Sequence, residues 1–140
     1  MELLAILAAG IFGGLVGSHL TRTRKQENLP RPSADAMAAA YSKLLEALTI
    51  VQEQLCTAMI AEEEKREIAA SVIEHLATST AVIYRLRYSF GHILPESLFD
   101  AVERSLRSRL QDTWKCRHDE LFAVRAEVLV HARRELGIQS

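Results

Sequence analysis

The sequence predicts an all-α protein in which one N-terminal transmembrane helix precedes a long antiparallel helical hairpin. Three observations lead to this fold class. Residues 3–21 carry no formal charge, apolar side chains recur at helical spacing through most of the remaining chain, and neither strand-like alternation nor an Asn-Gly hairpin turn occurs. We therefore expect a transmembrane anchor in residues 1–25, a linker in residues 26–32 and a helical hairpin domain in residues 33–140.

The first expected element is the membrane anchor. A helix over the nineteen residues 3–21 would span roughly 28 Å, close to the hydrocarbon thickness of a bilayer. Arg22, Arg24 and Lys25 follow this run, whereas the one charged side chain before it is Glu2. Because Lys- and Arg-rich flanks stay in the cytoplasm, we expect a single-pass protein of the plasma (inner) membrane with its N-terminus outside and its C-terminal domain in the cytoplasm. The alternative is a cleaved signal peptide, but such a peptide carries its basic residues before the apolar run.

Four glycines give the expected transmembrane helix a surface of small residues. Gly10 and Gly14 lie four residues apart, as do Gly13 and Gly17. Small residues at this spacing let two transmembrane backbones approach closely. The pattern predicts packing in the bilayer against a second copy or against another membrane protein. The alternative is that glycine is simply common in transmembrane helices.

The first helix of the hairpin is expected over residues 33–90. Pro30 and Pro32 disfavour helix in the linker, and Ser33 is a suitable N-cap for the helix that follows. No proline or glycine interrupts the chain from there to Gly91. Apolar residues recur alternately three and four positions apart, which is typical of a helix that packs along one stripe. The first such run comprises Tyr41, Leu44, Leu48, Val51, Leu55 and Ala58.

The charged segment 62–67 interrupts this apolar repeat. The repeat places Glu62 and Lys65 on the apolar stripe, where neither fits. It then resumes at Ala69, Val72, Leu76, Ser79, Ile83 and Leu86. We interpret the segment as a solvated face or a local break within one long helix. Its three adjacent glutamates do not predict a metal site, since consecutive helical residues point about 100° apart.

Residues 91–95 predict the turn of the hairpin. Gly91 can terminate the first helix, and Pro95 suits the first turn of a second helix over residues 95–136, which Gly137 would end. The apolar stripe of that helix comprises Leu98, Val102, Leu106, Leu110, Trp114, Leu121, Val124, Val128 and Leu136. Two long helices joined by a short turn fold back antiparallel.

The expected hairpin has more apolar surface than one helix–helix seam can bury. On the first helix, several apolar residues lie outside the seven-residue repeat: Leu45, Ile60, Ile68, Ile73, Val82 and Tyr88. A wide apolar stripe requires further packing partners. We therefore expect a homodimer in which two hairpins form a four-helix bundle.

A cluster of aromatic and basic residues precedes the turn. It comprises Tyr84, Arg85, Arg87, Tyr88 and Phe90. Arg and aromatic side chains are enriched at interaction hot spots, so a cluster at the hairpin tip, away from the membrane, would be well placed to bind a partner. In the alternative interpretation, the aromatic rings close the end of the core and the arginines are solvated.

No motif in the sequence points to catalysis. There is no Gly-rich phosphate loop, no HExxH and no GxSxG, and none of the five histidines lies three residues after a glutamate. Glu127 and His131 share a helix face, but such a lone pair is usually a surface hydrogen bond. Cys56 and Cys116 form no CxxC motif and are expected to be reduced thiols in the cytoplasm. We predict no enzyme activity, no catalytic residues, no cofactor and no metal site.

These observations together predict a membrane-anchored, non-enzymatic scaffold or adaptor. Its expected partners are the lipid bilayer, a second copy of itself and an unidentified membrane or cytoplasmic protein. Nucleic acid is not an expected partner, since residues 81–140 hold ten bases against eight acids and form no strongly basic segment. Two alternatives remain: an accessory single-pass subunit of a larger membrane complex, or a phage or mobile-element membrane protein that acts in lysis or exclusion.

Overall fold

The computed structural model describes residues 31–107 and 112–138, and its helices all belong to one unit, Pro32–Ser140. This part of the chain holds four helices and no strand, which confirms the all-α class. The helices are α2 (Ala34–Glu63), α3 (Ala70–Phe90), α4 (Glu96–Leu106) and α5 (Trp114–Leu136). The expected transmembrane span lies outside the described residues, and so do its glycines Gly10, Gly13, Gly14 and Gly17.

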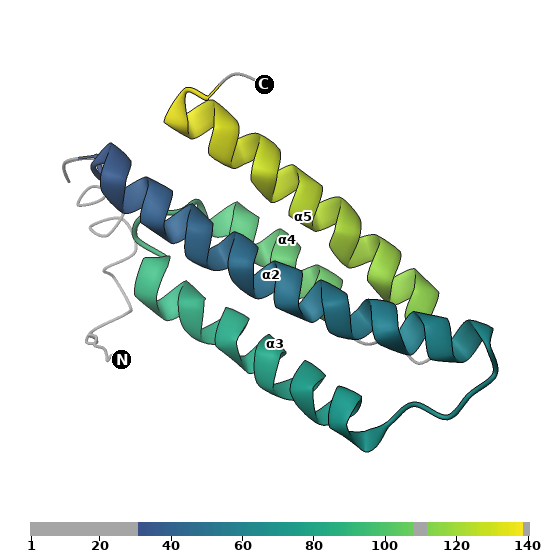
Figure 1. Ribbon diagram of the computed structural model, residues 1–140. Coiled ribbons are helices and arrows are strands. Elements are labelled where there is room, and N and C mark those ends of the chain that lie inside the picture. Colours follow the sequence, from purple (N-terminus) through teal and green to yellow (C-terminus); the bar gives the residue numbers. More distant parts are fainter. Residues whose placement is uncertain (1–30, 108–111, 139–140) are drawn as a thin grey trace, which may run out of the picture. The chain divides into compact units, whose positions relative to one another are not determined.

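Helix α2 is the centre of this unit. It packs against α5 on one side and α3 on the other and runs antiparallel to both, while α4 packs mainly on α5 (Figure 1). The apolar stripe predicted for α2 is buried at each of its six positions. The other helices add Leu76 and Ile83 from α3, Leu98, Phe99, Val102 and Leu106 from α4, and Leu121, Val128 and Ala132 from α5. Burial of each large apolar side chain stabilises the fold by about 1.5–3 kcal/mol, so the repeat that predicted helix also determines the packing.

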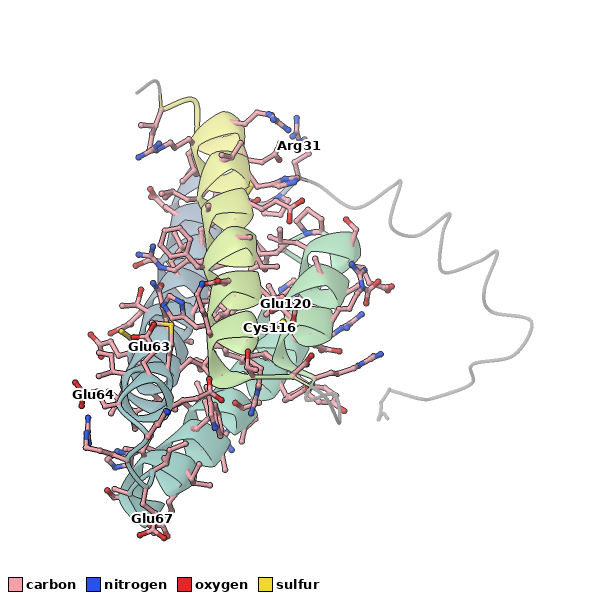
Figure 2. The ribbon with its side chains drawn as sticks, turned by 90° about the vertical axis from the view of Figure 1, so that its right-hand side faces the viewer. Arg31, Glu63, Glu64, Glu67, Cys116 and Glu120 are labelled. Carbon is pink, nitrogen blue, oxygen red and sulfur yellow. The ribbon has the colours of Figure 1, made fainter. Side chains whose placement is uncertain are left out.

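The single helix expected over residues 33–90 is wrong, because the chain forms two helices there. Helix α2 ends at Glu63, and α3 begins at Ala70 after the charged segment 62–67. The side chains of Glu63, Glu64 and Glu67 point outward around this connection (Figure 2). Of the two interpretations of the charged segment, the local break is therefore the one that the structure shows.

The break has a defined hydrogen-bond geometry. Lys65 adopts a left-handed conformation with φ 56°. The Arg66 N–H donates to the Ala61 carbonyl oxygen over 2.8 Å, and the Lys65 N–H donates to the Glu62 carbonyl oxygen over 3.1 Å. These two bonds form a Schellman motif, which satisfies the last carbonyl groups of a helix and usually has glycine at the left-handed position. Because lysine occupies that position here, the sequence contained no glycine to signal the end of α2.

The single helix expected over residues 95–136 is also wrong. Helix α4 ends at Leu106, and Arg107 after it is extended, with ψ 129°. Helix α5 begins at Trp114, where the Thr113 hydroxyl accepts a hydrogen bond from the Cys116 N–H. A Ser or Thr cap of this kind stabilises a helix start by about 1 kcal/mol, and it therefore favours a new helix over continuation of α4.

Three predicted boundaries are present in the structure. The Ser33 hydroxyl caps α2 by accepting from the Ala36 N–H over 3.1 Å. The segment 91–95 is a turn, in which the N–H groups of Ile93 and Leu94 both donate to the Phe90 carbonyl oxygen. Gly137 ends α5 in a left-handed conformation with φ 72°.

The break after α2 also changes where the predicted tip lies. Because α3 has 21 residues and α2 has 30, α3 runs back along about 31 Å of the roughly 45 Å length of α2. Residues 84–90 therefore lie toward the end of the unit at which α2 begins (Figure 1). The expectation that they form a hairpin tip far from Ser33 is wrong. The described part of one chain also contains four helices. A second copy is therefore not needed to supply the helices of a four-helix bundle.

Candidate partner-binding surface

The structure divides the predicted cluster of Tyr84, Arg85, Arg87, Tyr88 and Phe90 into buried and exposed members. Phe90 packs against the hydrophobic core, as the alternative interpretation expected of the aromatic residues. Tyr84 is 39% exposed, Tyr88 is 92% exposed, and Arg85 is also exposed. The cluster therefore presents two tyrosines and one arginine to solvent rather than five residues.

Arg87 fastens α3 to α4. Its guanidinium contacts the Asp100 carboxylate over 2.9 Å and the Glu103 carboxylate over 3.0 Å. Burial opposes the charge of Arg87, but its hydrogen bonds to Glu103 and Asp100 outweigh burial and raise the pKa of the guanidinium above its ordinary value. Arg87 is thus a structural cation whose charge is already balanced within the unit.

A hollow lies beside this ion-pair cluster. It has a volume of about 520 Å³ and is lined by Tyr84, Arg87, Tyr88 and Glu103. Phenol rings beside an arginine are groups that protein partners bind well. The lining brings no nucleophile next to a general base, so its chemistry suits recognition rather than catalysis.

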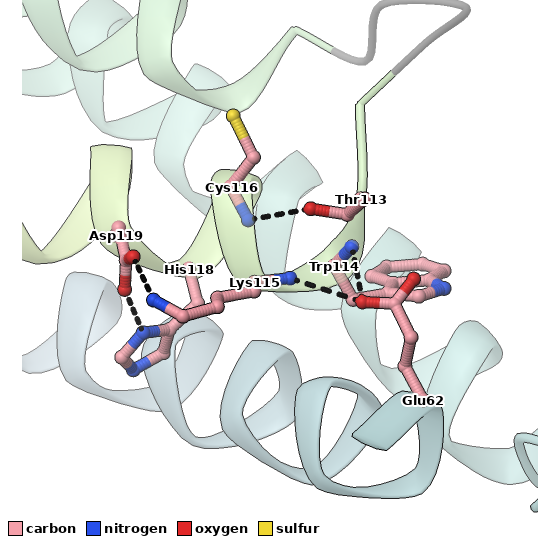
Figure 3. Close-up of polar contacts among 7 residues, drawn as sticks. All are labelled: Glu62, Thr113, Trp114, Lys115, Cys116, His118 and Asp119. Carbon is pink, nitrogen blue, oxygen red and sulfur yellow. Dashed lines mark hydrogen bonds and ion pairs between the residues drawn. The ribbon is translucent and has the colours of Figure 1, made fainter. Parts of the chain in front are cut away.

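The polar residues at the start of α5 form a capping cluster that joins two helices (Figure 3). The Glu62 carboxylate, at the end of α2, accepts hydrogen bonds from the backbone N–H groups of Trp114 over 3.0 Å and Lys115 over 3.3 Å. The Thr113 hydroxyl accepts from the Cys116 N–H over 3.0 Å. These acceptors satisfy N–H groups that a helix start leaves unpaired. The negative charge of the carboxylate is also attracted to the positive end of the helix dipole. Sequence reasoning missed this role of Glu62 because its partners lie 52 and 53 residues away.

The neighbouring charges on α5 pair with one another (Figure 3). Lys115 Nζ lies 2.7 Å from Asp119, and His118 Nδ1 lies 3.1 Å from the same carboxylate. The hydrogen bond to Asp119 raises the pKa of Lys115, whereas hydrogen bonds from Lys115 and then His118 lower the pKa of Asp119. Burial lowers the pKa of Arg117, which lies over the Trp114 ring with 4.6 Å between the guanidinium carbon and the ring centroid.

The structure gives these residues no arrangement for metal binding. In residues 31–107 and 112–138, no group of three His, Cys, Asp or Glu side chains could hold a metal ion. Cys56 and Cys116 are both free thiols. In the polar stretch after Thr113, the side chains of Lys115 and His118 both pair with Asp119.

An apolar groove between α2 and α5 is a second surface feature. It has a volume of about 330 Å³, and its lining includes Ala38, Tyr41 and Leu45 from α2 and Leu129 and Leu136 from α5. The Tyr41 hydroxyl is buried and has no hydrogen-bond partner among the described residues. Burial and then the charge of Glu135 raise the pKa of Tyr41, so the phenol stays protonated. A tyrosine at a core position of the predicted stripe was the signal that could have indicated this group.

Helix α2 meets the criteria of length and composition for a membrane span. Among the described helices it alone does so, with a mean hydropathy of 1.3 over its most apolar window. The core helix of a bundle can meet the same criteria, and α2 lies in the core between α3 and α5. It also carries exposed charges at Lys43, Glu46 and Glu53.

Comparisons of the chain with protein-family models, with curated proteins and with solved structures gave no match. Function is therefore inferred from the residues and contacts described above.

Proposed function

We propose that this protein is a membrane-anchored, non-enzymatic helical scaffold that self-associates and presents its helical domain to protein partners in the cytoplasm. One observation carries the proposal: an uncharged run at residues 3–21 that is long enough to cross a bilayer and is followed at once by Arg22, Arg24 and Lys25. The basic flank favours an N-terminus outside and residues 33–140 in the cytoplasm.

The contacts within the helical domain support a structural role. Glu62 caps α5 and Arg87 joins α3 to α4, so these two ionisable groups hold helices in place. Tyr84, Arg85 and Tyr88 remain accessible on the surface of α3. Large aromatic side chains beside arginine are the residue types that contribute most to protein–protein contacts.

An accessory subunit of a larger membrane complex is the second candidate. The observation that favours it is the spacing of Gly10, Gly13, Gly14 and Gly17, which suits close packing against another transmembrane helix. Cross-linking in native membranes separates the two candidates. Self-cross-links alone favour the autonomous scaffold, and a fixed stoichiometry with one multispan protein favours the subunit.

Alkaline carbonate extraction of the full-length chain tests the anchor. We expect the protein to stay in the membrane pellet and to have the mass of the uncleaved chain. In a separate protease-protection assay, protease should reach a C-terminal tag only after the cells are permeabilised. Replacing Arg22, Arg24 and Lys25 with Glu should disturb this orientation, because the basic flank determines it. The matched control replaces Arg133 and Arg134, at the end of α5, and should keep the orientation. Release into the carbonate supernatant, or recovery of a shortened chain, would refute the anchor.

A further inference from the structure

Helix α3 carries an apolar stripe along its solvent-exposed side. One face of α3 packs on α2, and the C-terminal end of α3 also contacts α4, where Tyr84 and Tyr88 line the hollow together with Glu103. The exposed stripe, spaced three or four residues apart, comprises Ala70, Ile73, Ala77, Ala81, Tyr84 and Tyr88. At 100° per residue these positions fall within a sector of about 80°. Ile73 is 43% exposed and Tyr88 is 92% exposed, so large apolar groups on this stripe face water.

The order of large and small residues makes the stripe complementary to its own reverse. If two copies of α3 pair antiparallel about a two-fold axis beside Ala81, Tyr84 lies opposite Ala77 of the other copy and Tyr88 lies opposite Ile73. The Tyr84 ring then meets a small residue, as side chains do when they pack into the holes of a facing helix, and the Tyr88 ring meets the apolar Ile73 side chain. In a parallel pair, by contrast, each tyrosine would meet its own counterpart.

The charges beside the stripe are complementary in the same arrangement. Glu74 and Arg85 both flank the stripe on one side, at about 100° and 120° from Ile73 around the helix. In the described residues neither side chain forms an ion pair, and their separation of eleven positions, about 16 Å, prevents them from pairing with each other in one helix. An antiparallel two-fold axis brings Glu74 of each copy beside Arg85 of the other. A symmetric interface of this kind repeats each contact twice.

We propose that the exposed stripe of α3 is the self-association surface of this protein and that its occupant is the α3 stripe of a second copy, paired antiparallel. The inference rests on the proposed function, because self-association is part of that function and the stripe is the surface that would mediate it. It does not depend on the transmembrane span. The Glu74–Arg85 pairs fix the register, since charged pairs at a rim determine specificity more than affinity.

Disulfide cross-linking of the full chain in membranes tests the surface. In a background with Cys56→Ser and Cys116→Ser, Ala81→Cys should form a disulfide-linked dimer, because the two copies of residue 81 lie beside the two-fold axis. His75→Cys, exposed on another side of α3, is the matched control and should give no dimer. Ala77→Cys should give none either. Its two copies would be offset along the axis by about 10 Å, and a disulfide requires Cα atoms within about 7 Å.

Charge reversal tests the register in the Ala81→Cys protein. Glu74→Arg alone and Arg85→Glu alone should each lower the dimer yield at least threefold, and the two changes together should restore it. Absence of the Ala81→Cys dimer, an equal yield from Ala77→Cys, or no restoration by the double reversal would overturn the proposal. Carbonate extraction of the same samples separates the two failures. A carbonate-resistant protein that does not cross-link refutes the α3 surface alone, and a cross-linked protein that carbonate releases refutes the anchor alone.

Discussion

Replacement of Lys65 by glycine tests the end of helix α2 most directly. Lys65 occupies the left-handed position of the Schellman motif, with φ 56°. Its backbone N–H donates to the Glu62 carbonyl oxygen, and its side chain is exposed. The substitution therefore removes no packed side chain and keeps both hydrogen bonds of the motif.

The expected gain follows from the backbone conformation. A left-handed conformation costs an L-residue about 1–2 kcal/mol, and glycine avoids this cost. Glycine loses about 0.5–1 kcal/mol more conformational freedom on folding, which offsets part of the gain. We expect Lys65→Gly to raise the free energy of unfolding by about 0.5–1 kcal/mol. For a domain near 100 residues, this corresponds to an increase in Tm of about 2–6 °C.

Thermal unfolding of the full chain in mild detergent, followed by circular dichroism, measures the effect. If residues 33–90 formed one continuous helix, the same glycine would lower the free energy of unfolding by up to about 1 kcal/mol, so the two structures predict opposite signs. Gly137→Ala is the matched control at the end of α5. An added Cβ there meets no atom within 4 Å, so the φ of 72° alone should lower stability by about 1 kcal/mol. A fall in Tm for Lys65→Gly would refute the break after α2.

Two further substitutions test contacts that join helices distant in sequence. Glu62→Ala should lower the free energy of unfolding, measured by urea titration, by about 1–2 kcal/mol, because it removes the acceptor for two N–H groups at the start of α5. Glu63→Ala, exposed one position later, should change that free energy by less than about 0.5 kcal/mol. Arg87→Met should cost about 1 kcal/mol, since it leaves two carboxylates of α4 without their cation. Arg104→Met, exposed on α4 and outside the proposed α3 interface, should cost less than about 0.5 kcal/mol. Equal effects within either pair would contradict the contact assigned to Glu62 or to Arg87.

The apolar repeat predicted the large buried side chains of α2, but it missed the buried alanines Ala40, Ala47 and Ala61. Leu44, Leu48 and Val51 recur at a spacing that places them on one face of a helix, and hydrophobic burial acts on that face whatever the partner helix is. The cap by Ser33 and the end at Gly137 were predictable for a similar reason. Both depend on side-chain and backbone preferences within four residues of the chain.

The candidate surface was predicted less completely. The sequence grouped Tyr84, Arg85 and Arg87 by their nearness along the chain, but their roles depend on α4. Arg87 turns toward Asp100 and Glu103, which the turn at 91–95 brings alongside α3, and Arg85 has no such neighbours among the described residues. The Tyr84–Tyr88 hollow exists because α4 packs beside α3, and no local pattern encodes that arrangement.

The sequence by itself determined that the domain is all-α, which face of α2 is apolar and where three of the helix boundaries lie, because these properties depend on residues a few positions apart. Tertiary structure alone decided that the two expected helices each divide in two. Lys65 is held in a left-handed conformation that lysine disfavours, and the Glu62 carboxylate provides a cap for a helix that begins 52 residues later. Both arrangements depend on the packing of α3 and α5 against α2. That burial compensates for the cost of the left-handed Lys65 and brings the start of α5 to Glu62, and it contributes more free energy than any one boundary residue.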